Sequence, residues 1–338
     1  MIQQDIPEFP VIIELDPLRV SREEMIAFSE RFDPQPFHLD EAAAAATLLG
    51  GLSASAWYVC TKLNDLLSGA LALRSVPSEV VGAEQIILLA PVRAGDVLNA
   101  TTQFGALQNC RCGNLESEAI LEVTNQSGQS VARMTLSCVI GRSGQARQPD
   151  YGLCCFRHGR EARATRRRRI HAIRFFEDVE IGDEIYLGDY EFGNAEVHDF
   201  LQRAGFEAQD REPYDHDLVP SWHLPSAWMQ CMVSYYERET IRLQACGRPV
   251  PRLGPAAGIK QLRWHRPIAV GETITFRGWA ERKISIPSQK HWGLLVVGAE
   301  GIDPSGKVVV SFYPQMLLER AAVREPAPVS ITKNLKGT

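Results

Sequence analysis

The sequence predicts an α+β fold in which one unit, a long helix wrapped by a curved antiparallel sheet, occurs twice in tandem. Two observations carry this prediction. Four segments of the first half reappear in the same order in the second half. Each half also reads as a long helix followed by three or four strands. The length of 338 residues agrees with two units of roughly 150 residues each.

The internal repeat consists of four collinear matches. Segment 84–98, EQIILLAPVRAGDVL, resembles 260–274, KQLRWHRPIAVGETI, with Pro91 opposite Pro267 and Gly95 opposite Gly271. The other three pairs are 25–31 with 197–203, 53–57 with 224–228, and 125–134 with 303–312. Chance can produce one such match, but four in one order indicate a duplicated unit. The predicted divisions are a first unit at 1–141, a basic linker at 142–170 and a second unit at 171–338.

Each element of the first unit has a local signal. Ser21 and Glu24 form a capping box at the start of a helix within 20–32. A longer helix is expected over 52–71, with 224–243 as its counterpart. Strands follow at 85–91, 96–104, 117–126 and 130–140, the last two joined by a hairpin turn at Gly128. Because one unit leaves a sheet edge open, two copies can pair into one sheet, which makes an intramolecular pseudo-dimer. Whether two chains also pair as a homodimer stays open.

Composition limits the function classes. The formal charge of −5 gives no overall attraction to nucleic acid. No apolar run approaches the roughly 18–20 residues that span a membrane, and the N-terminus lacks the pattern of a signal peptide. We therefore expect a cytoplasmic protein without nucleic-acid or membrane partners. The eight cysteines include no CxxC pair, so no metal site is expected. The run RRRR at 166–169 is interpreted as a solvated connector, with contact to ligand phosphates as the alternative.

The run RFDPQPFHLDE at 31–41 holds the residues best suited to chemistry. Pro34 and Pro36 stiffen the backbone around Asp33 and His38. A carboxylate and a nearby imidazole can share one water and divide the transfer of its protons. Rigid placement matters because a shift of about 1 Å can cost about 10²-fold in rate. The spacing thus favours an acid–base pair over a turn that merely carries polar groups.

The residues FDPQPFHLDEA, followed by GGLSASAW and PVRAGD, resemble the MaoC-like (R)-specific enoyl-CoA hydratases of the hotdog fold. The family signature falls here on Asp33, Pro36, His38 and Asp40, while Gln35 stands where these hydratases usually carry Asn. The resemblance implies a double hotdog and a hydro-lyase that acts on an acyl-CoA or acyl-carrier thioester, as in fatty acid metabolism. It implies Asp33 and His38 as catalytic residues, Gln35 as a substrate-binding residue, and no cofactor other than the thioester substrate itself.

The segment GGLSASAW is expected to hold the thioester carbonyl. Backbone N–H groups at a helix start provide donors and a positive dipole end. Gly50 and Gly51 have no Cβ to obstruct the carbonyl, so the N–H groups near Gly51 and Leu52 are the candidate substrate-binding groups.

The second unit lacks the acid–base pair. Along the repeat, Asp33 falls opposite Gly205 and His38 opposite Asp210. This unit is therefore expected to complete the sheet and shape the acyl pocket. His216 and His223 lie near the degenerate site, and the sequence DHD at 215–217 is interpreted as a loop.

The leading hypothesis is reversible hydration of a trans-2-enoyl thioester to its 3-hydroxyacyl form. A branched dicarboxylic substrate of the mesaconyl-CoA type is compatible with it. An acyl-CoA thioesterase is an alternative because fold does not fix reaction. A non-catalytic acyl-thioester binding protein is the alternative from another class.

Overall fold

The computed structural model describes residues 12–74, 76, 78–110, 114–141, 167–206 and 217–321. The helices are α1 (Arg22–Phe32), α2 (Pro36–Leu39), α3 (Glu41–Ala45), α4 (Ala56–Ala72), α5 (Asn194–Arg203) and α6 (His223–Ala245), with a short 3₁₀ helix at Phe176–Asp178. The strands are β1 (Ile12–Glu14), β2 (Leu18–Arg19), β3 (Ser78–Leu88), β4 (Val97–Phe104), β5 (Gln108–Asn109), β6 (Leu115–Thr124), β7 (Ser130–Ile140), β8 (Arg168–Arg169), β9 (Asp183–Glu191), β10 (Leu253–Trp264), β11 (Thr273–Ser285), β12 (Trp292–Ile302) and β13 (Val308–Glu319).

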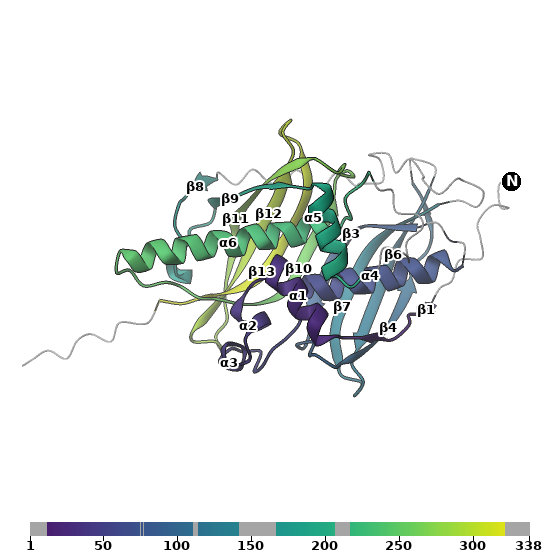
Figure 1. Ribbon diagram of the computed structural model, residues 1–338, viewed down its shortest axis with the longest axis horizontal. Coiled ribbons are helices and arrows are strands. Elements are labelled where there is room, and N and C mark those ends of the chain that lie inside the picture. The colour runs from purple at the N-terminus through teal and green to yellow at the C-terminus, as the bar shows by residue number, and fades with distance from the viewer. Residues whose placement is uncertain are drawn as a thin grey trace, which may run out of the picture.

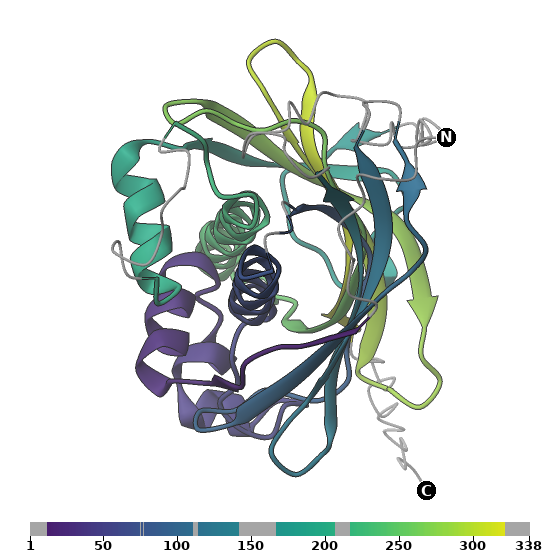
Figure 2. The same ribbon diagram turned by 90° about the vertical axis from the view of Figure 1, so that its right-hand side faces the viewer.

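One sheet runs through the whole fold (Figure 1). Its strands follow the order β1-β4-β6-β7-β3-β10-β13-β12-β11-β9-β8, with β2 paired to β4 and β5 paired to β6. Figure 2 looks along α4 and α6 and shows the sheet curving around both helices. The predicted α+β architecture, long helices wrapped by an antiparallel sheet, is confirmed.

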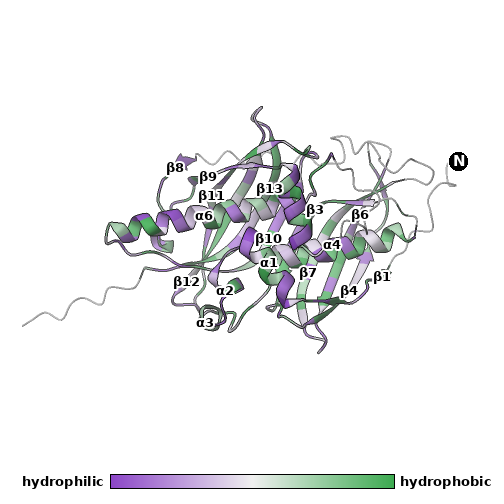
Figure 3. Ribbon diagram, viewed as in Figure 1, coloured by the Kyte–Doolittle hydropathy of each residue, from purple (hydrophilic) through white to green (hydrophobic). Residues whose placement is uncertain are grey.

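The elements occur twice in the same order. The series α1, α4, β3, β4, β6, β7 has the counterpart α5, α6, β10, β11, β12, β13. The two series meet where β3 pairs with β10, so the strand order of one is reversed in the other. Buried and exposed residues alternate along strands such as β4 and β6. Figure 3 shows hydrophobic and hydrophilic residues interspersed along the strands and the long helices. The apolar face of each strand is therefore turned toward the helices.

Two glycines permit the junction between β3 and β10. The strands pair antiparallel from Gly82 opposite Arg263 to Ile87 opposite Gly258. A Cβ at Gly82 would lie 2.7 Å from the carbonyl oxygen of Leu262 on the other strand. Gly258, at the equivalent position of the repeat, would press its Cβ against a β3 carbonyl in the same way. The close approach of the strands therefore requires glycine on both sides.

The first helix begins as predicted, but its capping box is only half formed. The Ser21 hydroxyl accepts a hydrogen bond from the Glu24 N–H at 3.2 Å. The Glu24 carboxylate instead accepts from the Tyr58 hydroxyl at 2.8 Å and pairs with Lys62 at 3.3 Å. Both partners lie on α4, so Glu24 joins the two helices and does not return to its own N-terminus.

The long helix α4 begins later than the sequence suggested. Its N-cap is Ser55, whose hydroxyl accepts a hydrogen bond from the Trp57 N–H at 3.3 Å. The predicted turns at Gly95 and Gly128 are present, with φ of +86° and +77°. Such positive φ values suit glycine because it has no Cβ.

Aromatic rings join the helices of the two halves to each other and to the sheet. Phe312 of β13 lies edge-on to Trp57 of α4 and to Trp228 of α6, at centroid distances of 5.5 and 5.1 Å. Phe200 of α5 packs against Phe28 and Phe32 of α1. Aromatic pairs of this kind contribute about 0.5–1.5 kcal/mol each beyond their buried area.

His223 belongs to this aromatic core. Its ring is fully buried, stacks on Phe200 at 4.5 Å and meets the rings of Phe32 and Phe192 edge-on. The Tyr190 hydroxyl lies 3.1 Å from Nε2, while Nδ1 has no hydrogen-bond partner among the described residues. Burial, together with the charge of Arg31, lowers the pKa of His223 to about 3. The ring is therefore neutral and serves as packing.

The arginine run ends against the second unit. The Arg167 guanidinium lies 3.5 Å from the ring centroid of Trp279 and donates to Glu300 at 2.8 Å. Arg168 pairs with Asp183 at 2.6 Å, and β8 adds to β9 in parallel. These arginines therefore have acidic and aromatic protein partners.

Residues 142–166, most of the predicted linker, lie outside the described residues. No helix in the described ranges is long and apolar enough to cross a membrane.

Replacing Gly82 by alanine is expected to lower the free energy of unfolding by about 1–3 kcal/mol, the usual cost of overpacking. The added Cβ would meet the Leu262 carbonyl oxygen across the junction. Urea unfolding measures the change. Gly69→Ala is the matched control, because Gly69 lies within α4 with nothing within 4 Å of its would-be Cβ. This control should be neutral or stabilising, and equal losses in both variants would contradict the steric explanation.

His223 should make stability depend on pH. Its folded-state pKa of about 3 lies below the unfolded value of about 6.5, so only the unfolded chain takes up this proton between those pH values. The contribution of His223 to the free energy of unfolding should therefore fall by about 1.4 kcal/mol for each pH unit between about 6.5 and 3 as the pH decreases. His223→Phe should remove that slope in denaturant titrations at several pH values. His291→Phe, at an exposed position, should retain it.

Candidate active site

Asp33 lies directly after the last residue of α1, and the end of this helix sets its position. It is the C-cap residue, with its N–H donating to the Ser29 carbonyl at 3.0 Å. Its φ of −149° takes the chain out of the helix, and its side chain is only 4% exposed. A carboxylate therefore lies in the interior beside the start of α2.

His38 lies in the short helix α2, which begins with Pro36 and directs the imidazole back toward Asp33. The His38 Nε2 atom is 3.3 Å from Asp33 Oδ2. On the opposite side of the ring, Nδ1 lies 2.7 Å from the Ser53 carbonyl oxygen. Because a carbonyl can only accept, Nδ1 carries the proton of this hydrogen bond. Nδ1 is thus a donor, and Nε2 is the nitrogen that faces the carboxylate.

The Asp33 carboxylate receives two further donors. The Ser55 hydroxyl donates to Oδ2 at 2.7 Å, and the Gln35 side-chain amide donates to Oδ1 at 2.8 Å. Burial acts to raise the pKa of Asp33, but the His38 charge and the hydrogen bonds from His38, Gln35 and Ser55 outweigh it, so the pKa is lowered. Asp33 is therefore ionised near neutral pH although it is buried.

Two residues of this network were not singled out from the sequence. Ser53 supplies the carbonyl that fixes His38, and Ser55 is both the N-cap of α4 and a donor to Asp33. A serine directly before a helical apolar pattern is a recognisable N-cap signal. The second hydrogen bond of Ser55, however, depends on how α1 packs beside α4.

Gly51 and Leu52, the predicted carbonyl-binding residues, lie in the irregular segment before α4. Gly50 and Gly51 have positive φ values of +65° and +154°. The N–H groups of Gly51, Leu52 and Ser53 find no hydrogen-bond acceptor within the described part of the chain. Since Leu52 and Ser53 are buried, these are unusual groups, because most buried backbone N–H groups are paired.

Asp40, the last acid of the sequence motif, is the N-cap of α3. The Asp40 carboxylate accepts a hydrogen bond from the Ala43 N–H at 2.7 Å and so caps α3. Within the described part of the chain, this carboxylate makes no hydrogen bond with Asp33 or His38. Asp40 therefore orients the chain that follows His38.

The equivalent place in the second half carries different residues. Gly205 follows α5 where Asp33 follows α1, and its φ is +72°. A Cβ there would lie 2.6 Å from the Glu24 carboxylate, and the Gly205 carbonyl accepts from Lys62 at 3.4 Å. First-half side chains thus adjoin this position. Asp210 and His216 lie outside the described residues.

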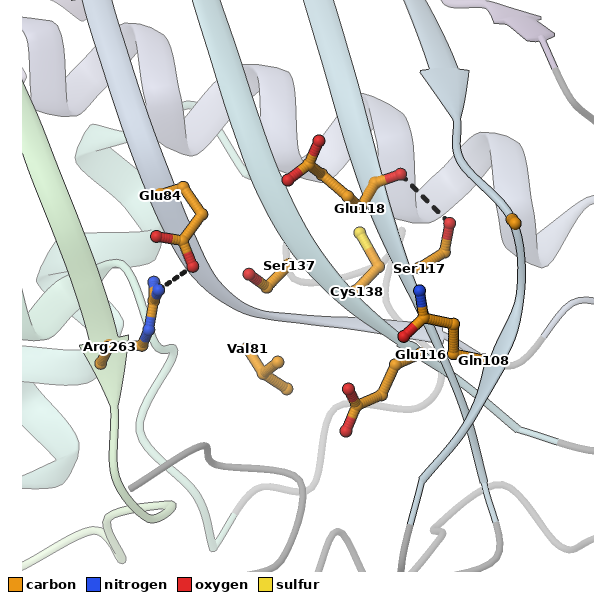
Figure 4. Close-up of a pocket in the computed structure, with 10 residues that line it drawn as sticks. Val81, Glu84, Gln108, Glu116, Ser117, Glu118, Ser137, Cys138 and Arg263 are labelled. Carbon is orange, nitrogen blue, oxygen red and sulfur yellow. Dashed lines mark hydrogen bonds and ion pairs between the residues drawn. The ribbon is translucent and has the colours of Figure 1, made fainter. Parts of the chain in front are cut away.

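A pocket elsewhere in the fold is formed by the sheet (Figure 4). It lies over β3, β6, β7 and β10, where Glu84 pairs with Arg263 across the junction of the two halves. None of the predicted site residues lines it. Across the described ranges, no cluster of three or more His, Cys, Asp or Glu side chains is arranged to hold a metal ion.

Comparison with known proteins supports the fold. A dehydratase with a MaoC domain from Chloroflexus aurantiacus superposes with a TM-score of 0.67 over 93% of this chain and 97% of its own, at 15% identity. The Mycobacterium tuberculosis protein RV0216, described as a double hotdog, gives 0.60 over 91% and 95% at 14% identity. A further MaoC-like dehydratase gives 0.60 over 92% and 98% at 16% identity.

The chain has the double hotdog fold of the MaoC-like dehydratases. The resemblance seen in the sequence is thereby confirmed at the level of fold. No family model matches the chain, and no curated protein matches it.

Ser55→Ala should raise the pKa of Asp33, because the carboxylate loses one of its donors. Loss of the N-cap should also cost about 0.5–2 kcal/mol of stability. The matched control is Ser21→Ala, which removes the N-cap of α1 without touching Asp33. A carbon-13 NMR titration of the Asp33 carboxyl distinguishes them, and a similar titration in both variants would contradict this role of Ser55.

Proposed function

We propose that this double hotdog protein is a hydro-lyase that adds water reversibly to a trans-2-enoyl thioester to give the 3-hydroxyacyl form. One observation carries the proposal. Asp33 and His38 are buried together, with His38 Nδ1 held by the Ser53 carbonyl, Nε2 facing the carboxylate, and Ser55 and Gln35 donating to that carboxylate. A buried, ordered acid–base pair of this kind suits proton transfer to and from one water. Carrier thioesters, of CoA or an acyl carrier protein, are the proposed substrates.

The proton transfers can be assigned to the pair as a unit. The water oxygen bonds to the β-carbon, and the pair accepts a proton from that water. A proton then passes from the pair to the α-carbon, so the substrate gains the elements of one water. Dehydration is the reverse of these steps. Each proton transfer by a positioned group contributes about 10²–10⁴-fold to the rate. No cofactor is needed for either transfer.

In this proposal Gln35 orients the pair, because its amide donates to the oxygen of Asp33 that His38 does not face. The N–H groups near Gly51 and Leu52 hold the thioester carbonyl, whose oxygen becomes negative as the enolate forms. Donors aimed at such an oxygen are often the largest contribution to catalysis. Their lack of acceptors within the described residues supports this assignment.

The test uses the purified chain and a panel of trans-2-enoyl-CoA thioesters of different length, with a branched dicarboxylic thioester included. Hydration is followed as loss of the enoyl-thioester absorbance. Asp33→Asn and His38→Ala should each lower kcat by at least about 10²-fold. Asp40→Asn is the matched control, since Asp40 belongs to the same motif but caps α3, and asparagine caps helices equally well.

Free thiol is measured in the same reactions. Release of thiol without hydration would establish a thioesterase instead, and binding without either product would establish a thioester-binding protein. Near-wild-type hydration by both Asp33→Asn and His38→Ala would refute the site.

A further inference from the structure

The segment before α4 holds the site together, although it has no regular structure of its own. Residues 49–55 include Gly50 and Gly51, and glycine restricts its backbone less than other residues do because it has no Cβ. Yet the Ser53 carbonyl must stay on His38 Nδ1, and Ser55 must stay on Asp33. Some external contact must fix this segment.

Arg93, in the turn between β3 and β4, makes that contact. Its guanidinium donates through Nη1 to the Leu52 carbonyl at 2.9 Å and through Nη2 to the Leu49 carbonyl. The same group lies against Gly51, with Nη1 3.1 Å from where a Cβ would stand. Glycine at 51 therefore makes room for the guanidinium.

Arg93 is itself anchored. Its backbone N–H donates to the Asp96 carboxylate at 2.7 Å. Asp96 also accepts from the Gln126 side chain at 3.0 Å, which ties the turn to the β6–β7 hairpin. The adjacent residue, Val92, accepts a hydrogen bond from the Ala54 N–H at 2.8 Å. One side of the segment is thus bound to a rigid turn of the sheet.

Peptide geometry places the Ser53 N–H, which has no acceptor among the described residues, on the side of the segment opposite Arg93. In a trans peptide the C=O and the N–H point in opposite directions. The Leu52 carbonyl faces Arg93, so the Ser53 N–H points away from it. The Ala54 N–H faces Val92, so the Ser53 carbonyl points away from that turn and toward His38. Ser53 therefore presents its N–H and its carbonyl on the same side, the side of His38.

We propose that Arg93 is the positioning residue that sets both groups of Ser53, the carbonyl that fixes His38 and the N–H that binds the thioester oxygen. The guanidinium also polarises the Leu52–Ser53 peptide, because a cation on the carbonyl oxygen strengthens the N–H of the same peptide as a donor. The inference rests on the proposed hydration, and it moves the principal carbonyl donor from Gly51 and Leu52 to Ser53. Neither the motif that contains Asp33 nor the internal repeat gives Arg93 a role in the site.

The experiment compares Arg93→Met, which removes the charge at similar length, with Arg93→Lys, which keeps a charge but cannot reach two carbonyls in a fork. For Arg93→Met, kcat of enoyl-CoA hydration should fall by about 10²–10³-fold, as for loss of one oxyanion donor, with KM little changed. Arg93→Lys should lie between it and the wild type. Arg252→Met, an exposed arginine paired with Glu319, is the control and should behave as wild type.

A second readout does not need turnover. Nitrogen-15 NMR of the His38 imidazole reports its Nδ1 hydrogen bond, which Arg93→Met should weaken and Arg252→Met should not. An unchanged His38 spectrum in Arg93→Met overturns the inference, whatever happens to kcat. If the wild type hydrates no thioester, the proposed function fails while the His38 spectrum still decides the role of Arg93. If Arg93→Met does not fold, kcat and the His38 spectrum of Arg93→Lys decide the inference instead.

Discussion

The pairing of β3 with β10 is the constraint on which the fold depends. Without it there would be two separate sheets, each with an open edge. With it, β13 of the second half carries Phe312 between Trp57 and Trp228, so the long helices of both halves share one core. Gly82 and Gly258 allow this pairing, and the pairing in turn brings the site of the first half close to the second half.

The polar groups of that site nevertheless come from a short stretch of the first half. Asp33, Gln35, His38, Ser53 and Ser55 all fall between residues 33 and 55. The second half contributes apolar surface, since Phe200 and His223 pack on Phe32, next to Asp33. Comparison of the two buried histidines shows how surroundings decide their use. His38 has a carbonyl on one nitrogen and a carboxylate by the other, whereas His223 is enclosed by rings and is held neutral.

The sequence was sufficient to predict the duplicated α+β fold and the pairing of Asp33 with His38. The repeat and the apolar periodicity are local signals, and the prolines restrict the few residues between acid and base. The partners of the pair were harder to predict. Ser53 acts through a backbone carbonyl, which no residue type reveals. Arg93 lies about forty residues beyond the segment it binds and reaches it only after β3 has folded back. The start of α4 was placed too early because small residues precede Ser55 as well as follow it.

Glu24 bears on one difference between the halves, the glycine at 205 opposite Asp33. Its carboxylate occupies the space that a side chain at 205 would need, and it is held there by Tyr58 and Lys62 of the same half. An acid at 205 would therefore lie beside the like charge of Glu24, which disfavours two ionised carboxylates. A single substitution at 205 would therefore not reproduce there the surroundings that Asp33 has in the first half.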